Sequence, residues 1–339
     1  MNRISTRGKN YNIPLCLFHV DRLYTAFKRV GTFKIGNYIG PDTTNSFSVD
    51  LKQSIIKANS EGIERRSLMI GSKELISNCT CAYDLINKTT VTLPHKYSVY
   101  QVGGDHPCDT TGTAVHYKSE KAINKAILEL LEKNSLFLFW YGKKGWLVKD
   151  KLDNYIIKYL NNKNLLIKIY FNTEFNPLIS VFVIIINTRK EVLSTGTSIG
   201  LSFNSTLEKA LEEAYLLYWQ NGTLEFNSLK RNEPFEYPVF YDYFTGFETK
   251  KIPDKFNNDY INLNWRIIID CLPSWIQDLN LLYLQNSSNH NLKCVKVFSH
   301  SLYNHVPLKI YINPKIAINQ NTLRLNQNDL NEIPECIFV

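Results

Sequence analysis

The stretch SEKAINKAILELLEKNSLFLFWY, Ser119 to Tyr141, predicts a long amphipathic helix in the middle of the chain. Its apolar residues recur every three or four positions, which is the spacing of one helix face, and Ser119 stands where an N-cap is expected. Glu129, Glu132 and Lys133 fall on an adjoining face, because residues three or four apart are neighbours on a helix. The apolar face consists of Ile123, Ala126, Ile127, Leu130, Leu131 and Leu138.

A motif similar to the acidic part of this helix occurs earlier in the chain. ELLEKNSL (129–136) and EGIERRSL (61–68) both read Glu, two residues, Glu, a base, one residue, Ser, Leu. In a helix, Glu61, Glu64 and Arg65 would lie together. Surface ion pairs four residues apart, worth about 0.3 kcal/mol, would explain this pattern. Alternatively, two helices gather four carboxylates, and Mg²⁺ is the usual cation for such a group beside phosphates.

A third predicted helix, over 205–220, follows later. Ser205 and Glu208 read as its capping box, and Gly222 as its C-terminal stop. Glu213, Leu217 and Gln220 lie one turn apart on a face that adjoins the apolar one. This helix therefore offers further polar groups to the same site.

The common phosphate-binding loops are absent from the sequence. Neither G-x-x-x-x-G-K-[ST] nor G-x-G-x-x-G occurs, and Gly103-Gly104 lacks the spacing and the Lys. A nucleotide would have to be held by side chains and metal ions. The stretch STGTSIGLSF (194–203) is rich in Gly and Ser, and we expect a loop suited to close backbone approach to a ligand.

Short apolar, β-branched segments are interleaved with the helices, which predicts a mixed α and β fold with several sheets. LISVFVIII (178–186) is read as a buried strand. The polar stretches 42–48, 221–235 and 286–292 are expected connections. Strands are expected at 164–171, 178–186, 266–272, 294–298 and 308–312, and helices at 51–68, 119–138, 151–161 and 205–220.

Composition narrows the class of protein. The 339 residues, 44% of them hydrophobic, suffice for a large core, and a net charge of +8 favours an anionic partner. No block of like charges marks a nucleic-acid arm, and Trp140, Tyr141 and Trp146 are simply explained as core, so no nucleic acid is expected. The N-terminal stretch shows no apolar core of signal-peptide length and no cleavage signature, and the longest apolar run of the chain is about half the length that spans a bilayer. We expect a cytoplasmic protein without membrane contact.

Seven scattered cysteines indicate reduced thiols rather than a disulfide framework. Cys79 and Cys81, with His95 or the His-Pro-Cys cluster at 106–108 nearby, offer ligands for zinc, but no second cysteine pair accompanies them. Structural zinc is therefore not expected.

Three segments, in this order, resemble the YcaO family. They are SIIKANSEGIERR (54–66), TTGTAVHYKSEKAINKAILELLEKNSLFLFWY (110–141) and STGTSIGLSFNSTLEKALEEAYLLYWQ (194–220). In that family a Gly-Thr or Gly-Leu strand leads into an ALxxxLLExxER helix, and an ALxxAxxExxQ helix follows. The resemblance covers about residues 50 to 222 and is closest to azoline-forming members.

This resemblance implies a YcaO-type domain with several sheets flanked by helices and an ATP site between helices. Its carboxylates would hold Mg²⁺ and the triphosphate, and its basic and amide side chains would contact the nucleotide. The implied Mg²⁺ ligands are Glu61, Glu64, Glu129 and Glu132, and the other implied nucleotide contacts are Arg65, Lys133 and Gln220.

Several positions depart from the family pattern. Lys133 stands where Arg is usual, which keeps the charge but loses bidentate geometry. Leu217 stands where Glu is usual, and Glu213 where Arg is frequent. The C-terminal IPECIFV retains Pro334 of the proline-rich end of azole-forming members, whose terminal carboxylate is thought to reach the active site; here Val339 is the candidate.

The activity implied by the resemblance is that of an ATP-dependent peptide cyclodehydratase. A Cys, Ser or Thr side chain of a ribosomally made precursor, such as that of a bacteriocin or another antibiotic, attacks the preceding amide carbonyl. ATP then phosphorylates the resulting oxygen, and loss of phosphate leaves a thiazoline or oxazoline. Two alternatives stay open: thioamide or amidine formation by the same phosphorylation, and a non-catalytic YcaO scaffold in a peptide-modifying complex.

The resemblance also implies partners, namely the precursor peptide, a protein that binds its leader, and an azoline dehydrogenase in the same complex. We expect an N-terminal arm over 1–45, a candidate for the partner contact. The YcaO-type catalytic domain follows over 46–339, with its motifs in 50–222 and a divergent part in 223–339.

Overall fold

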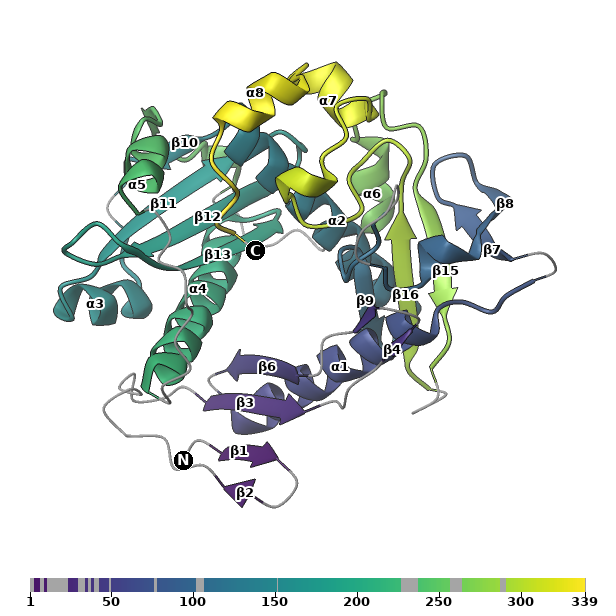
Figure 1. Cartoon of the computed structure of the whole chain (residues 1–339), viewed down its shortest axis with the longest axis horizontal. Coiled ribbons are helices and arrows are strands. Elements are labelled where there is room, and N and C mark those ends of the chain that lie inside the picture. The colour runs from purple at the N-terminus through teal and green to yellow at the C-terminus, as the bar shows by residue number, and fades with distance from the viewer. Residues whose placement is uncertain are drawn as a thin grey trace.

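The computed structural model shows a mixed α and β fold, as predicted (Figure 1). Within the part that it describes, the chain forms four sheets and eight α-helices. In that part no helix is both long enough and apolar enough to cross a bilayer. The described residues are 3–6, 9–10, 24–29, 34–35, 38–39, 43–48, 50–75, 78–101, 107–150, 152–226, 237–256, 264–286 and 291–338.

An N-terminal sheet, in the order β2-β1-β3-β6, lies against helix α1 (Leu51–Ile70). The stretch expected as a connection at 42–48 is mostly strand β6, so that expectation is wrong. Thr44 is buried, and its hydroxyl donates to the carbonyl of Ala58 at 2.9 Å, so the polar side chains of this strand serve α1 rather than solvent. The strands here are β1 (Arg3–Thr6), β2 (Lys9–Asn10), β3 (Tyr24–Arg29) and β6 (Thr43–Ser48), beside a separate pair, β4 (Lys34–Ile35) and β5 (Tyr38–Ile39).

The first five-stranded sheet, β13-β12-β11-β10-β14, carries helix α4 (Phe203–Phe226) on one face. Every residue of β12 is buried, which confirms the predicted core strand. A Cβ at Gly196 would stand 2.1 Å from the carbonyl oxygen of Ala210, so this glycine allows α4 to touch the sheet. The stretch 194–203, expected as a Gly- and Ser-rich loop, is mostly strand β13, so that expectation is wrong. This region contains β10 (Trp146–Val148), α3 (Tyr155–Asn162), β11 (Leu166–Asn172), β12 (Ile179–Ile186), β13 (Val192–Gly200), α5 (Tyr237–Thr245), β14 (Thr249–Lys250) and the 3₁₀ turn Asp254–Phe256.

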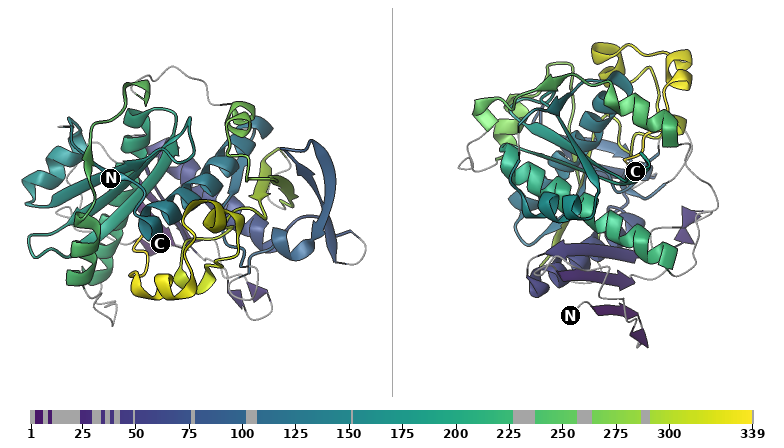
Figure 2. Two further views of the ribbon diagram at one scale, coloured as in Figure 1. Left: turned by 90° about the horizontal axis from the view of Figure 1, so that it is seen from above. Right: turned by 90° about the vertical axis from the view of Figure 1, so that its left-hand side faces the viewer.

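The second five-stranded sheet, β8-β7-β15-β16-β9, lies on the other side of helix α2 (Ser119–Gly142), which packs between the two sheets (Figure 2). The predicted apolar stripe of α2 is confirmed as core. Ser119 is the first helical residue rather than the N-cap, which is Lys118. This sheet contains β7 (Cys79–Asp84), β8 (Thr89–Pro94), β9 (Thr113–His116), β15 (Asn280–Leu284) and β16 (Lys293–Phe298), with a 3₁₀ turn at His95–Ser98.

Two expected strands are wrong. Residues 266–272 lie mainly in helix α6 (Trp265–Asp270), whose first turn is capped by the side chain of Asn264. Residues 308–312 form only the 3₁₀ turn Lys309–Tyr311. Helices α7 (Ala317–Thr322) and α8 (Gln327–Glu332) follow.

Helix α4 also differs from its prediction at both ends. It begins at Phe203, so Ser205 lies inside the first turn and does not form the expected capping box with Glu208. It continues past Gly222, which is not its stop.

The C-terminal segment is anchored in the core. The indole nitrogen of Trp140 donates to the carbonyl of Pro334 at 2.9 Å, and Phe338 is buried in edge contact with Phe139 and Phe182. Trp140 is fully buried, as expected for a core residue. These contacts bring the end of the chain beside β13 (Figure 1).

Candidate functional site

Three helices that carry the predicted motifs, α1, α2 and α4, lie around one region of the molecule (Figure 1). Both α1 and α2 pack on β9, and α4 reaches β6, on which α1 lies. Lys57 of α1 forms an ion pair with Glu212 of α4 at 3.7 Å. The predicted association of the helices is therefore present.

On α1, Arg65 is held by two partners. One guanidinium nitrogen, Nη2, lies 2.7 Å from Oε1 of Glu61, and Nη1 donates to the carbonyl of Thr43. Burial raises the pKa of Glu61, against the charge of Arg65 and the backbone N–H of Asn45. This pair is the i,i+4 bridge expected from spacing, built on a partly buried face.

Glu64 on α1 lies within electrostatic range of Glu129 on α2. Burial, followed by the charges of Glu129 and Glu61, holds the pKa of Glu64 well above its usual range. Burial likewise raises the pKa of Glu129 to about 8, against the charge of Lys133 and with that of Glu132. The two helices thus bring carboxylates close enough to repel one another.

Lys133 is surrounded by acidic side chains. Its Nζ lies 3.1 Å from Oε1 of Glu132, and both side chains keep only 16% of their exposure. Burial would lower the pKa of Lys133, but Glu132, Glu213 and Glu129 together raise it. Burial raises the pKa of Glu132 to about 7, with Lys133 opposing. Lys133 is therefore a permanent cation among three carboxylates.

Helix α4 adds Glu213 to this group. The backbone N–H of Thr197 on β13 donates to Oε2 of Glu213 at 2.6 Å, and burial raises the pKa of this carboxyl. Leu217, where the family pattern has Glu, is partly buried one turn later. The sequence marks Glu213 only as a departure from the family pattern. Its spacing of one helical turn from Leu217 is the feature that could have placed it on the site face of α4. The side chain of Gln220 lies outside the described residues.

The C-terminus approaches the same cluster. Val339 itself lies outside the described residues. Two residues before it, the carbonyl of Ile337 accepts from the Thr195 hydroxyl at 3.2 Å. Burial raises the pKa of the Cys336 thiol to about 12, and the charge of Lys133 opposes that rise. The tail is therefore tied to β13, the strand whose Thr197 N–H holds Glu213.

The donor set has the chemistry that Mg²⁺ prefers, because it is made of carboxylate oxygens. In the described part of the chain, no group of three or more His, Cys, Asp or Glu side chains is arranged to hold a metal ion. The described residues include the glutamates of the predicted site and the cysteines Cys79 and Cys81. His106 lies outside them. The structure brings together the carboxyl groups of Glu129, Glu132 and Glu213 around Lys133.

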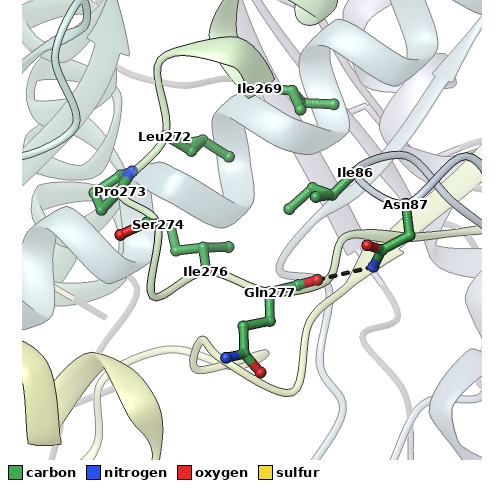
Figure 3. A pocket seen from close by; sticks show the side chains of 8 residues that line it. All are labelled: Ile86, Asn87, Ile269, Leu272, Pro273, Ser274, Ile276 and Gln277. Carbon is green, nitrogen blue, oxygen red and sulfur yellow. Dashed lines mark hydrogen bonds between the residues drawn. The ribbon is translucent and has the colours of Figure 1, made fainter.

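A surface pocket of about 540 Å³ lies elsewhere, between the β7–β8 turn and the segment that follows α6 (Figure 3). Asn87 Nδ2 donates to the carbonyl of Gln277 across it at 3.0 Å. Its lining has no titratable side chain, so it lacks the groups for chemistry. It is lined by Ile86, Asn87, Ile269, Leu272, Pro273, Ser274, Ile276 and Gln277.

The model of the family described as "YcaO cyclodehydratase, ATP-ad Mg2+-binding" matches residues 72–237. A comparison with curated protein sequences returns no match. The match includes Glu129, Glu132 and Lys133 and begins after α1.

Solved structures share the fold. YcaO from Methanopyrus kandleri bound with AMPPCP and Mg²⁺ is 13% identical, with a TM-score of 0.62 over 83% of this chain and 86% of that chain. The E. coli microcin synthetase McbBCD complex is 15% identical, with a TM-score of 0.68 over 89% and 95%. A heterocyclase in complex with substrate and cofactor is 13% identical, with a TM-score of 0.64 over 86% of this chain and 50% of that chain. Residues 72–237 thus match the YcaO family model, and the chain shares the fold of solved YcaO structures.

Proposed function

We propose that this chain is an ATP-dependent cyclodehydratase that converts Cys, Ser or Thr of a ribosomally made precursor peptide to thiazoline or oxazoline. The observation that carries the proposal is the electrostatic coupling of buried carboxyls from α1 and α2, Glu64 and Glu129, on a helix where Lys133 lies 3.1 Å from Glu132. The description of the family as ATP- and Mg²⁺-binding supports the choice of ligand.

In this proposal the Mg²⁺-triphosphate lies between α1 and α2. Carboxylates that repel one another have a high affinity for a divalent cation. The positive charge of the ion offsets both their mutual repulsion and the cost of burying them in the ionised form. Arg65 and Lys133 would contact phosphate oxygens, and Gln220 the nucleotide. The metal ligands would be Glu61, Glu64, Glu129 and Glu132.

Bound ATP would supply the phosphoryl group that turns the amide oxygen, a very poor leaving group, into a good one. The protein's own part is positioning and charge balance. Lys133 keeps its proton because three carboxylates surround it, so it offers a fixed positive charge. The tie from Thr197 to Glu213 fixes the α4 side of the site, where Leu217 offers no carboxylate.

We extend the proposal to the C-terminus and to partners. The Val339 carboxylate would reach the reacting peptide, since Ile337 is fastened to β13 beside the cluster. A partner would bind the leader of the precursor, and an azoline dehydrogenase would complete the complex; the E. coli synthetase that shares the fold is a complex. The N-terminal arm over 1–45 is our candidate for the contact with that partner.

Mass spectrometry of a precursor peptide incubated with the chain, its partner, ATP and Mg²⁺ tests the proposal. Loss of one water per modified residue, dependent on ATP, is the expected result. Replacement of oxygen by sulfur or by an amine would show thioamide or amidine formation instead. Peptide binding without ATP consumption would show a scaffold, and both of these results would overturn azoline formation.

A further inference from the structure

A cavity of about 630 Å³ opens between the sheet β8-β7-β15-β16-β9 and the segment that leads into α7. Val91 and Leu93 of the edge strand β8 give it an apolar wall, and the side chains of Asn280 and Gln320 also line it. Apolar groups beside a few polar ones are typical of a binding site. The amides of this lining match the hydrogen-bonding groups of a peptide.

The imidazole of His300 is held in one orientation at this cavity. Its Nδ1 lies 2.7 Å from Oδ2 of Asp278, and the rings of Phe298 and Tyr97 meet it edge-on, with centroids 5.0 and 5.9 Å away. Because a carboxylate accepts hydrogen bonds, Nδ1 is assigned the proton. The hydrogen bond to Asp278 also raises the pKa of His300, which favours the charged ring with Nε2 as a second donor.

The cavity offers positive rather than negative charge to a ligand. Lys315 lines it and is exposed, and among the described residues its ammonium takes part in no ion pair. The acidic residues of the lining, Asp84 and Asp278, use their oxygens inside the protein. Asp84 accepts from neighbouring backbone N–H groups, and Asp278 accepts from His300 and from the hydroxyl of Ser299. The groups left for a ligand are therefore two cations, which fit a carboxylate.

The cavity lies on the face of the sheet that also carries α1. Along β15, the side chains of Asn280, Leu282 and Leu284 point to one face, because strand residues alternate. Asn280 lines the cavity. At the other end of the strand, Leu284 packs with Ile63 and Leu68 of α1. These two ends of β15 are about 13 Å apart, so about four extended residues of a peptide span this face from the cavity to α1.

We propose that this cavity binds an acidic residue of the precursor peptide, at a distance from the residue that is modified. The carboxylate contacts His300 and Lys315, while an apolar neighbour in the peptide packs on Val91 and Leu93. This inference rests on the proposed function, which makes a peptide the substrate. A free small anion and an acidic segment of the partner protein are the competing occupants.

Binding of capped tripeptides to the full chain tests the chemistry of the cavity without ATP or Mg²⁺. A Leu-Glu-Leu peptide is compared with its Leu-Gln-Leu counterpart while the imidazole signals are followed by NMR, and His300→Gln identifies the signal of His300. We expect the Glu peptide to shift this signal and to bind at least about tenfold more tightly than the Gln peptide. Lys315→Met should weaken binding of the Glu peptide about tenfold, whereas Lys121→Met, which removes an exposed charge on α2, should leave it unchanged.

Three results of this titration would overturn the proposal. They are equal binding of the two tripeptides, unchanged binding by Lys315→Met, and glutarate binding as tight as that of the Glu peptide. In the last case the cavity would hold a free anion rather than a peptide.

Kinetics distinguish the precursor from the partner protein as the source of the acidic residue. With a precursor that the wild-type chain modifies, Lys315→Met should raise KM about tenfold and leave kcat within about twofold. An unchanged KM would assign the cavity to the partner and overturn the inference. Absence of azoline formation by the wild-type chain, with tripeptide binding intact, would instead overturn the proposed function and with it the assignment to a precursor.

Discussion

In the octet at 61–68, Arg65 bridges back one turn to Glu61 and also reaches the carbonyl of Thr43, whereas in the octet at 129–136 Lys133 contacts its neighbour Glu132. The two octets have the same spacing and different partners. A guanidinium can serve two acceptors in fixed directions, while an ammonium is a point charge that settles where the negative field is strongest. Spacing on a helix therefore brings charges together without deciding which pair forms.

Removing the cation of each octet should have unequal effects. At pH 8, Lys133→Met is expected to lower the free energy of unfolding by about 3 kcal/mol, because it leaves several buried carboxylates without their partner. Arg65→Met should lower it by about 1 kcal/mol, since Arg65 and Glu61 keep 25% and 30% of their side-chain exposure. Urea unfolding measures both, and equal losses would contradict the difference between the octets.

The α2 octet should also dominate the pH dependence of stability. The folded-state pKa values of Glu129, about 8, and Glu132, about 7, lie above the ordinary value of 4.5. The folded chain therefore keeps protons that the unfolded chain has lost, so stability falls as pH rises from about 4.5 to about 8. The ligand-free melting temperature should drop between pH 5 and pH 8.

Glu129→Gln should flatten this drop, and Glu61→Gln should change it less, because Arg65 offsets part of the burial of Glu61. A melting temperature that stays constant over this range in the wild-type chain would show that the carboxyls of α2 are not protonated in the folded state.

Exchanging the two kinds of cation should have the smallest effect. Arg65→Lys is expected to lose either the bridge to Glu61 or the contact with Thr43, because one ammonium cannot replace the fork; the cost is about 0.5 kcal/mol, less than that of Arg65→Met, which loses both contacts. Lys133→Arg should change the free energy of unfolding by less than about 0.5 kcal/mol. Urea unfolding of both would reveal a reversed order, which would mean that the fork of Arg65 contributes nothing.

Much of the fold could be predicted from periodicity. The helices α1, α2 and α4 and the strand β12 have long, regular patterns, and they were found. The short apolar runs at 266–272 and 308–312 fit helix and strand equally, and there the local cap at Asn264 and the chain's tertiary packing decided. At 42–48 the polar composition indicated a connection, but the segment is mostly a strand, whose Thr and Ser side chains pack on a helix.

The candidate site could be predicted only as a set of residues. The family pattern pointed to the glutamates of α1 and α2, and the structure places these helices together. It could not indicate that Lys133 would contact Glu132 or that Glu213 would accept from Thr197. These contacts join residues from separate elements, and no local spacing encodes them.

Calorimetric titration of the chain with Mg²⁺ and a non-hydrolysable ATP analogue tests most directly whether α1 and α2 share one metal-nucleotide site. We compare the wild type with Glu64→Gln, Glu129→Gln, the double variant, and Glu208→Gln as an exposed control on α4. The account predicts that each single site variant weakens Mg²⁺-dependent binding at least about tenfold and that the control binds as the wild type does. Undiminished binding by the double variant would contradict it.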